Sequence, residues 1–266
     1  MIVFCLTLYF QPTKVGQSIS LDHYSHLDYH EENSHSLSDF NKKIAPYKLE
    51  EIIQERLSKN KMKRQKTRVM EIGFGNGRVL MELKKLFPDI EFYGINKEKT
   101  HTFYRRESFI HTALKFEIMS KEEAEENLPY VVFKDLDFGN HIPYNDSRFD
   151  VIFSQHTLTH LHYSVELINE TLRVLKTGGT SIHSDLGDLK IYDQNIQISL
   201  KEAAVELRKK GFAIHANDSL QMLRVDKTNS TRSSIPLVPL TAIPQKIDSL
   251  PSDSRKSSLG YQLKLQ

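Results

Sequence analysis

One short run near residue 70 limits the possible folds of this chain more than any other: Val69-Met-Glu-Ile-Gly-Phe-Gly-Asn-Gly-Arg78. The apolar start of the run ends at Gly73, glycine recurs at Gly75 and Gly77, and a helical pattern follows. Glycine lets the backbone turn sharply and approach a ligand closely. At a strand-to-helix turn, backbone N–H groups and the positive end of the helix face such a ligand. The run therefore predicts a strand, a ligand-binding turn and a helix.

The surrounding pattern extends this run into a βαβ unit. The helix is expected to end near Phe87, before Pro88, and the apolar run 92–95 follows as a second strand. A strand, a glycine turn, a helix and a second strand within about 30 residues need a parallel sheet with a right-handed crossover. The pattern thus favours an α/β fold.

Composition limits the class of protein. The 266 residues contain 36 Lys+Arg and 34 Asp+Glu, so no global charge favours a nucleic acid or an anionic membrane. The single cysteine, Cys5, excludes an internal disulfide framework and fits a reducing compartment. No apolar run approaches the ~20 residues that span a bilayer, and the apolar segment 1–10 lacks the flanks of a secretory signal. We expect a cytoplasmic protein.

The spacing of the glycines favours one type of cofactor loop. A dinucleotide-binding loop has the pattern G-x-G-x-x-G, whereas this chain has G-x-G-x-G with Glu71 two residues before the first glycine. This pattern resembles the cofactor loop of class I S-adenosylmethionine-dependent methyltransferases. At the end of the second strand, where an acid usually binds the ribose hydroxyls, this chain has Asn96. Its amide still forms a hydrogen bond, but without the stronger charge-assisted interaction.

Further motifs of the same family follow in the same order. Ile142-Pro-Tyr144 and Phe149-Asp150 resemble the turn and the Phe-Asp pair that precede the fourth strand. Residues 173–179, Arg-Val-Leu-Lys-Thr-Gly-Gly, resemble the turn before the fifth strand, with Thr177 in place of proline. Asp137 and Phe138 match the acid and apolar pair that contacts the adenine, with Asp135 as the alternative acid.

The resemblance implies an α/β, Rossmann-like fold, in which a mostly parallel sheet of seven strands has helices on both faces. It covers residues 46–228, so we expect an N-terminal extension 1–45, a methyltransferase domain 46–228 and a Ser/Pro-rich, disordered tail 229–266. The tail contains eight Ser and four Pro in 38 residues. The implied cofactor is S-adenosyl-L-methionine, and the implied cofactor-binding residues are Glu71, Gly73, Phe74, Gly75, Asn76, Gly77, Asn96, Asp137, Phe138, Ser154 and Gln155.

Candidate catalytic groups follow the fourth strand, predicted at 151–153. Ligands of open α/β sheets bind at the carboxyl ends of the strands, so Ser154, Gln155 and His156 should face the cofactor and the methyl acceptor. A general base is needed only if the acceptor must lose a proton. We identify His156 and His160 as the candidates, ahead of His183 and Asp185, although each of these groups also fits a structural role.

Two polar segments have competing interpretations. Four histidines between residues 22 and 35 could bind a metal ion, but without cysteine and among several acids they indicate a polar surface segment, so we predict no metal site. The segment 1–45 fits a lid over the substrate. Residues 59–68 contain six basic residues, but no aromatic residues interleave for base stacking, so we interpret them as a solvated loop rather than an RNA-binding patch.

The acceptor cannot be read from these motifs, which are closest to those of methyltransferases acting on small molecules. Glu-Ile-Gly-Phe-Gly also occurs in tRNA guanine-N7 methyltransferases, but their proline- and tryptophan-containing stretch is absent. Ser154-Gln-His-Thr157 also differs from the Asn/Asp-Pro-Pro-aromatic run of DNA amino-methyltransferases. The glycine spacing disfavours a nicotinamide-dependent dehydrogenase. A non-catalytic methyltransferase-like binding or assembly protein stays open, because Asn96 and Thr177 depart from the family pattern.

Overall fold

The centre of the fold consists of two strands that are buried on both faces, β1 (Arg68–Ile72) and β4 (Phe149–Gln155). In the computed structural model, which describes residues 35–96, 106–133, 141–161, 164–187, 189–191 and 193–229, these strands pair in parallel. Near-continuous apolar runs are typical of parallel strands that helices cover on both sides. Strand β1 also pairs in parallel with β2 (Glu91–Asn96), which confirms the predicted parallel βαβ core.

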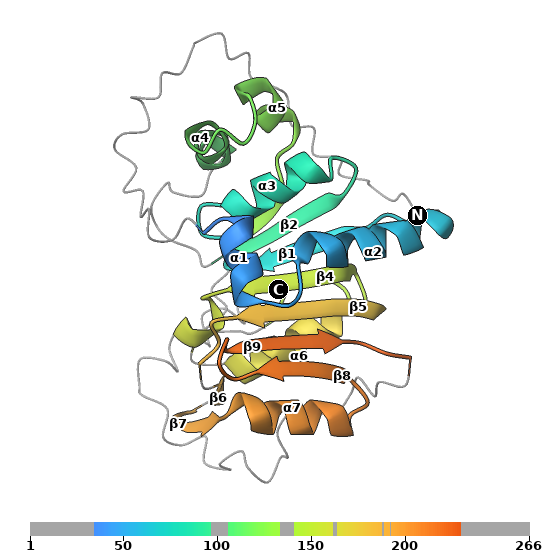
Figure 1. The fold of residues 1–266 in the computed structure, drawn as a ribbon, viewed down its shortest axis with the longest axis vertical. Helices are drawn as coiled ribbons and strands as arrows, with labels where there is room; N and C mark the ends of the chain where they lie inside the picture. Colours follow the sequence, from blue (N-terminus) through green and yellow to red (C-terminus); the bar gives the residue numbers. More distant parts are fainter. Residues whose placement is uncertain are drawn as a thin grey trace, which may run out of the picture.

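Seven strands form one sheet in the order β3-β2-β1-β4-β5-β9-β8 (Figure 1). The first five pair in parallel, β9 is antiparallel to β5, and β8 is antiparallel to β9. This arrangement confirms the predicted Rossmann-like sheet of seven mostly parallel strands. A separate hairpin consists of β6 and β7. The other strands are β2 (Glu91–Asn96), β3 (Tyr130–Phe133), β5 (Leu175–Ser184), β6 (Leu189–Ile191), β7 (Asp193–Ile198), β8 (Ala213–Asn217) and β9 (Met222–Asp226).

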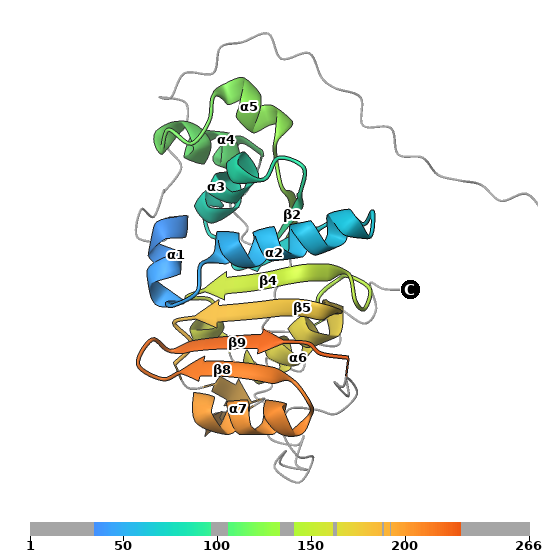
Figure 2. The same ribbon diagram turned by 45° about the vertical axis from the view of Figure 1, so that its right-hand side comes forward.

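Helices cover both faces of the sheet, as predicted. Side chains alternate along β1, so that Val69 belongs to one buried cluster with the helices α1 to α4, and Met70 to another with α6 and α7. In Figures 1 and 2, α1 and α2 lie on one side of β4 and β5, and α6 lies on the other. The helices are α1 (Leu37–Lys43), α2 (Leu49–Met62), α3 (Arg78–Leu86), α4 (Arg106–Lys115), α5 (Lys121–Glu126), η4 (Leu158–His160, a 3-10 helix), α6 (Ser164–Val174) and α7 (Leu200–Lys209).

Two helices have boundaries that depend on local contacts. Helix α2 begins at Leu49 and continues to Met62, so it includes part of the basic stretch. Helix α7 begins at Leu200, because Ser199 caps it: the Ser199 hydroxyl accepts from the Glu202 N–H, and the Glu202 carboxylate accepts from the Ser199 N–H. The residues before this cap form β7.

Helix α1 belongs to the predicted extension 1–45, yet it packs on the sheet. Phe40 is fully buried, and its ring lies 5.4 Å from the ring of Phe153 on β4. The Leu37 N–H donates to the Glu82 carboxylate of α3 at 2.6 Å, and Lys43 pairs with Asp185 beyond β5 at 2.9 Å. These contacts attach α1 to the edge of the sheet at which β1, β4 and β5 end.

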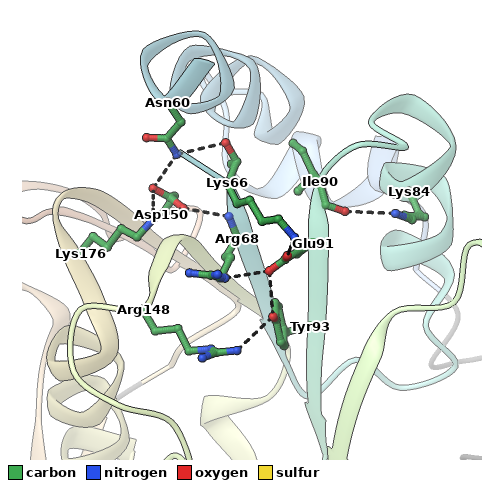
Figure 3. A network of polar contacts seen from close by, with 11 residues as sticks. Asn60, Lys66, Arg68, Lys84, Ile90, Glu91, Tyr93, Arg148, Asp150 and Lys176 are labelled. Atoms are coloured by element: carbon green, nitrogen blue, oxygen red, sulfur yellow. Dashed lines mark hydrogen bonds and ion pairs between the residues drawn. The ribbon is translucent and has the colours of Figure 1, made fainter. Parts of the chain in front are cut away.

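A polar network stabilises the opposite edge, where the strands begin (Figure 3). The buried Asp150 carboxylate accepts from Asn60 of α2, from the backbone N–H of Arg68 on β1 and from Lys176 on β5, all within 3.0 Å. Next to it, the Glu91 carboxylate accepts from Lys66, Arg68 and Tyr93. Although burial opposes ionisation, these bonds lower the pKa of Glu91 to about 2.

Candidate functional site

The glycine loop joins the end of β1 to the start of α3. Gly73 and Gly77 have φ values of +74° and +75°, and Gly77 is the N-cap residue of α3. A Cβ on Gly77 would lie 2.1 Å from the ring of Phe109, and one on Gly73 would lie 2.0 Å from the Thr157 hydroxyl. Both the backbone conformation and the packing thus require glycine. The loop directs the first turn of α3 to the carboxyl edge of the sheet, where an anionic or polar ligand would meet N–H groups.

Glu71 lies directly before this loop and has an unusual environment. It is 4% exposed, and its Oε2 atom has no hydrogen-bond partner among the described residues. Burial, with a further contribution from Glu82, raises the pKa of Glu71 well above its usual value. Glu82 itself accepts from the Arg78 guanidinium and from the Leu37 N–H. A buried carboxyl with an unpaired oxygen is costly unless a ligand supplies the donor.

Gln155 presents a second unpaired atom at the same edge. Glu71 is level with Phe153 in the β1–β4 register, and Gln155 follows two residues later, so Glu71 and Gln155 lie on the same face of neighbouring strands. Gln155 is 8% exposed, and its Oε1 atom also has no partner within the described part of the chain. Two buried polar atoms without partners fit a site that a polar ligand completes.

Asn96 ends β2, beside the loop on the other side. The strand before it is joined to the loop, since the Gly73 N–H donates to the Ile95 carbonyl at 2.7 Å. Asn76 in the loop is tied to α4, because the Thr112 hydroxyl donates to its carbonyl at 2.9 Å. Asp137 and Phe138, predicted to contact the adenine, and the alternative Asp135 lie outside the described residues.

Two predicted cofactor contacts have side chains directed elsewhere. Phe74 is 4% exposed and packs against Phe109 and over Gly94, where a Cβ would meet it at 2.6 Å. Only its backbone is left for a cofactor. The Ser154 hydroxyl is hydrogen-bonded to Nδ1 of the buried His183 at 2.7 Å, on the face opposite Gln155. Sequence spacing gave no indication of this, because β4 is buried on both faces and only its register with β5 shows that Ser154 faces His183.

The predicted catalytic histidines lie at the carboxyl ends of the strands. His156 and His160 are both exposed, and their ring centroids are 6.2 Å apart with an interplanar angle of 24°. His35, directly before the cap of α1, also stacks on His156, with centroids 5.8 Å apart. Asp185, a further candidate, follows β5 as His156 follows β4, directly after the register pair Gln155 and Ser184. Its carboxylate pairs with Lys43.

The sequence did not reveal Thr157. Its hydroxyl donates to the carbonyls of Ile72 on β1 and Gln155 on β4, and so joins the two central strands where the strand order reverses. No motif marks this residue.

The sequence also did not show that some of the family motifs have structural roles. Asp150 lies at the other edge of the sheet, and Arg173 donates to the carbonyls of Ile142 and Tyr144, which fixes the loop before β4. These motif residues stabilise the fold.

A comparison with protein families decides the class. The profile of a family described as "Methyltransferase domain" matches residues 63–231, which is more than half of the 266 residues. The chain belongs to this methyltransferase family. Together with the strand order and the glycine loop, the match identifies a class I S-adenosylmethionine-dependent methyltransferase domain. No curated protein sequence matches the chain significantly.

Several of the solved structures that the chain matches are described as methyltransferases. A protein from Galdieria sulphuraria, assigned as a sarcosine dimethylglycine methyltransferase, is 17% identical over 63% of this chain and 61% of its own, with a TM-score of 0.40. A SAM-dependent methyltransferase from Aquifex aeolicus is 20% identical over 71% and 95% of the two chains, with a TM-score of 0.38. This methyltransferase thus spans about six-tenths of the length of the Galdieria protein.

None of the helices in the described ranges combines the length and the apolar character that a bilayer crossing requires. Over the same residues, no group of three or more His, Cys, Asp or Glu side chains is arranged to hold a metal ion.

Proposed function

We propose that this protein transfers a methyl group from S-adenosylmethionine to a small-molecule acceptor. The observation that carries this proposal is the buried carboxyl of Glu71, whose Oε2 atom has no partner among the described residues. It lies two residues before a loop of glycines with positive φ, at the point where the strand order reverses. Membership of the methyltransferase family supports it. The single cysteine of the chain supports a cytoplasmic location as part of the same proposal.

The residues at this edge fit the methyl donor. Glu71 would accept a hydrogen bond from the ammonium of its methionine part, and this interaction would offset the burial of the carboxyl. Backbone N–H groups of the loop 73–77 other than those of Gly73 and Gly77, which donate to the Ile95 and Phe74 carbonyls, would bind its carboxylate. The Asn96 amide would bind a ribose hydroxyl, and Gln155 would donate or accept at the same face. Asp137 and Phe138 stay proposed adenine contacts.

The chemistry requires few protein groups. When bound, the cofactor supplies a methyl group on a sulfonium centre, which an acceptor displaces in line. The protein then positions the acceptor and excludes water. His156 and His160 are exposed at the edge where the acceptor would enter, and either imidazole would take a proton from an acceptor that must lose one.

Binding of S-adenosylhomocysteine to the wild type, to Glu71→Ala and to Glu206→Ala tests this function. Glu206 lies on α7 and pairs with Lys209. The next strand, β8, is the edge strand of the sheet far from β1, so Glu206 serves as the control. Loss of a charge-assisted bond should weaken calorimetric binding by Glu71→Ala about tenfold or more, with no change for Glu206→Ala. A folded wild type that does not bind S-adenosylhomocysteine would contradict the proposed function.

The second candidate function is that of a non-catalytic methyltransferase-like binding or assembly protein. Asn96 stands where the family has an acid, and Thr177 stands where it has proline. A folded protein that ignores the cofactor would favour this alternative. Binding of S-adenosylmethionine, followed by its conversion to S-adenosylhomocysteine in the presence of an acceptor, would reject it.

A further inference from the structure

Three imidazole rings are joined by two stacking contacts that share His156, and we call this group the histidine stack: His35, His156 and His160. The centroid distances are 5.8 Å and 6.2 Å, and the interplanar angles are 27° and 24°. Both distances fall within the range of stacked aromatic pairs. His35 comes from the segment before α1, whereas the other two follow β4. The stack thus joins α1 to the carboxyl edge of the sheet.

The backbone under the stack is strained in two places. His156 and Asp185 each follow the last register pair of β4 and β5, Gln155 with Ser184, and their φ values are +56° and +54°. Residues other than glycine rarely adopt this conformation, and when they do it often serves a functional site. The Asp185 carboxylate accepts from Lys43, and its neighbour Ser184 accepts from the His156 N–H at 3.4 Å. These contacts hold His156 and Asp185 at the carboxyl edge of the sheet.

Charged groups on all neighbouring elements affect the ring of His35. Burial is the main cause that lowers its pKa, and His156 and Lys43 lower it further, while Asp185 and Asp39 raise it. The net effect favours the neutral imidazole. A neutral imidazole accepts a hydrogen bond through one ring nitrogen and donates one through the other.

We propose that the histidine stack binds a planar aromatic acceptor with an acidic hydroxyl, a phenol, and that His156 accepts its proton while His35 positions the ring of His156. This inference rests on the methyl transfer proposed above. Aromatic rings pair favourably with the imidazole faces. His156 is exposed and contacts both other rings, whereas His35 is half-buried and contacts the ring of His156 from the segment before α1. The Asp185 carboxylate adds negative charge beside the stack.

The step balances in atoms and electrons. A lone pair of the phenolic oxygen forms the new bond to the methyl carbon while the carbon–sulfur bond breaks, and its electron pair stays on sulfur. The phenolic proton passes to a ring nitrogen of His156 and then to water. No oxidant, reductant or metal ion takes part.

Two probe molecules separate stacking from proton transfer. 4-Nitrophenol carries the acidic hydroxyl, and its phenolate absorbs visible light, whereas 4-nitroanisole has the same ring without the proton. Both are titrated into the full chain saturated with S-adenosylhomocysteine, with affinity measured by calorimetry and ionisation by absorbance below neutral pH. The variants are His35→Ala, His35→Phe, His156→Phe and the control His215→Ala, an exposed histidine on β8 that contacts Tyr47.

The wild type should bind both probes and raise the phenolate absorbance of 4-nitrophenol. His35→Ala should weaken both affinities about fivefold, as loss of one stacked pair predicts, and His35→Phe should restore them. His156→Phe should keep the affinity for 4-nitroanisole but lose the phenolate signal. His215→Ala should behave as the wild type.

Two outcomes would overturn the histidine stack while the cofactor site stands. In the first, S-adenosylhomocysteine binds the wild type but neither probe does. In the second, His35→Ala and His156→Phe bind the probes and ionise 4-nitrophenol as the wild type does. Absence of S-adenosylhomocysteine binding to the folded wild type would instead overturn the proposed function itself.

Discussion

Thr157 occupies the space above Gly73, so that a Cβ on Gly73 would lie 2.0 Å from Oγ1 of Thr157. The same hydroxyl donates to the Ile72 carbonyl at 3.0 Å and to the Gln155 carbonyl at 2.9 Å. One side chain therefore closes the turn of the glycine loop and joins it to β4. The tight fit explains why the first glycine of the loop has no room for a side chain.

Gly73→Ala should destabilise the protein by roughly 2–4 kcal/mol, because the left-handed φ and the clash with Thr157 add together. Chemical unfolding measures this change. The double variant Gly73→Ala/Thr157→Gly removes the clash but keeps the strained φ. Gly73→Ala should therefore destabilise the Thr157→Gly protein less than it destabilises the wild type. An unchanged midpoint for Gly73→Ala would contradict this packing.

Asp150→Ala should destabilise the fold by about 3–5 kcal/mol, because it leaves Lys176, Asn60 and the Arg68 N–H without their buried acceptor. Binding of S-adenosylhomocysteine by the folded fraction should not change, since Asp150 lies at the opposite edge of the sheet (Figure 3). Asp146→Ala is the matched control: this carboxylate also pairs with a cation, Arg173, but it is 75% exposed, and we expect little change. Equal losses for the two variants would argue against the buried network.

His183 should make stability fall with acid. Burial lowers the pKa of His183 from 6.5 to about 3, and both ring nitrogens contact buried serines, Ser154 and Ser181. Between these two pKa values the unfolded chain binds a proton that the native state does not bind. Stability therefore decreases as pH falls from about 6.5 towards 3, by about 1.4 kcal/mol per pH unit for this one group.

His183→Gln keeps hydrogen-bonding capacity without a titrating ring, so unfolding measured between pH 7 and 4 should show a shallower slope than the wild type. The carboxylates with lowered pKa, such as Glu91, act in the same direction in both proteins and cancel in this comparison. Identical slopes would mean that His183 is not buried as a neutral ring.

Glu71 should make the stability of the cofactor-free protein fall as pH rises, which is the opposite of the effect of His183. It should also couple cofactor binding to the release of a proton. Because its folded-state pKa is raised, the native state without cofactor keeps a proton that the unfolded chain loses, so stability falls as pH rises above about 4.5. An ammonium beside Glu71 favours the ionised carboxylate, so binding of S-adenosylhomocysteine should release a proton. Calorimetry in buffers of different ionisation enthalpy measures that proton, and it should be absent in Glu71→Gln. Proton release that persists in this variant would exclude Glu71 as its source.

The sequence predicted the sheet and the glycine loop because both depend on local pattern. The residues within each motif are neighbours in the chain, and their pattern is typical of the element they form. These motifs are Val69 to Ile72, the glycines and the Phe149-Asp150 pair. The orientation of Ser154 and the packing of Phe74 depend on register and on the facing α4 helix, so only the structure reveals them. His35 and Thr157 reach the site through tertiary contacts across many residues, and no local pattern marks such contacts.

The most direct test of the central claim is calorimetric titration of S-adenosylmethionine into the wild type, Gly75→Arg and Gly178→Arg. Gly75 and Gly178 both have positive φ, at +51° and +81°, so the two substitutions impose similar backbone strain, but Gly178 lies beside Arg56 at the opposite edge. We expect the wild type and Gly178→Arg to bind with similar affinity and Gly75→Arg not to bind. Equal binding by all three proteins, or none by a folded wild type, would contradict the assignment of this loop to the cofactor.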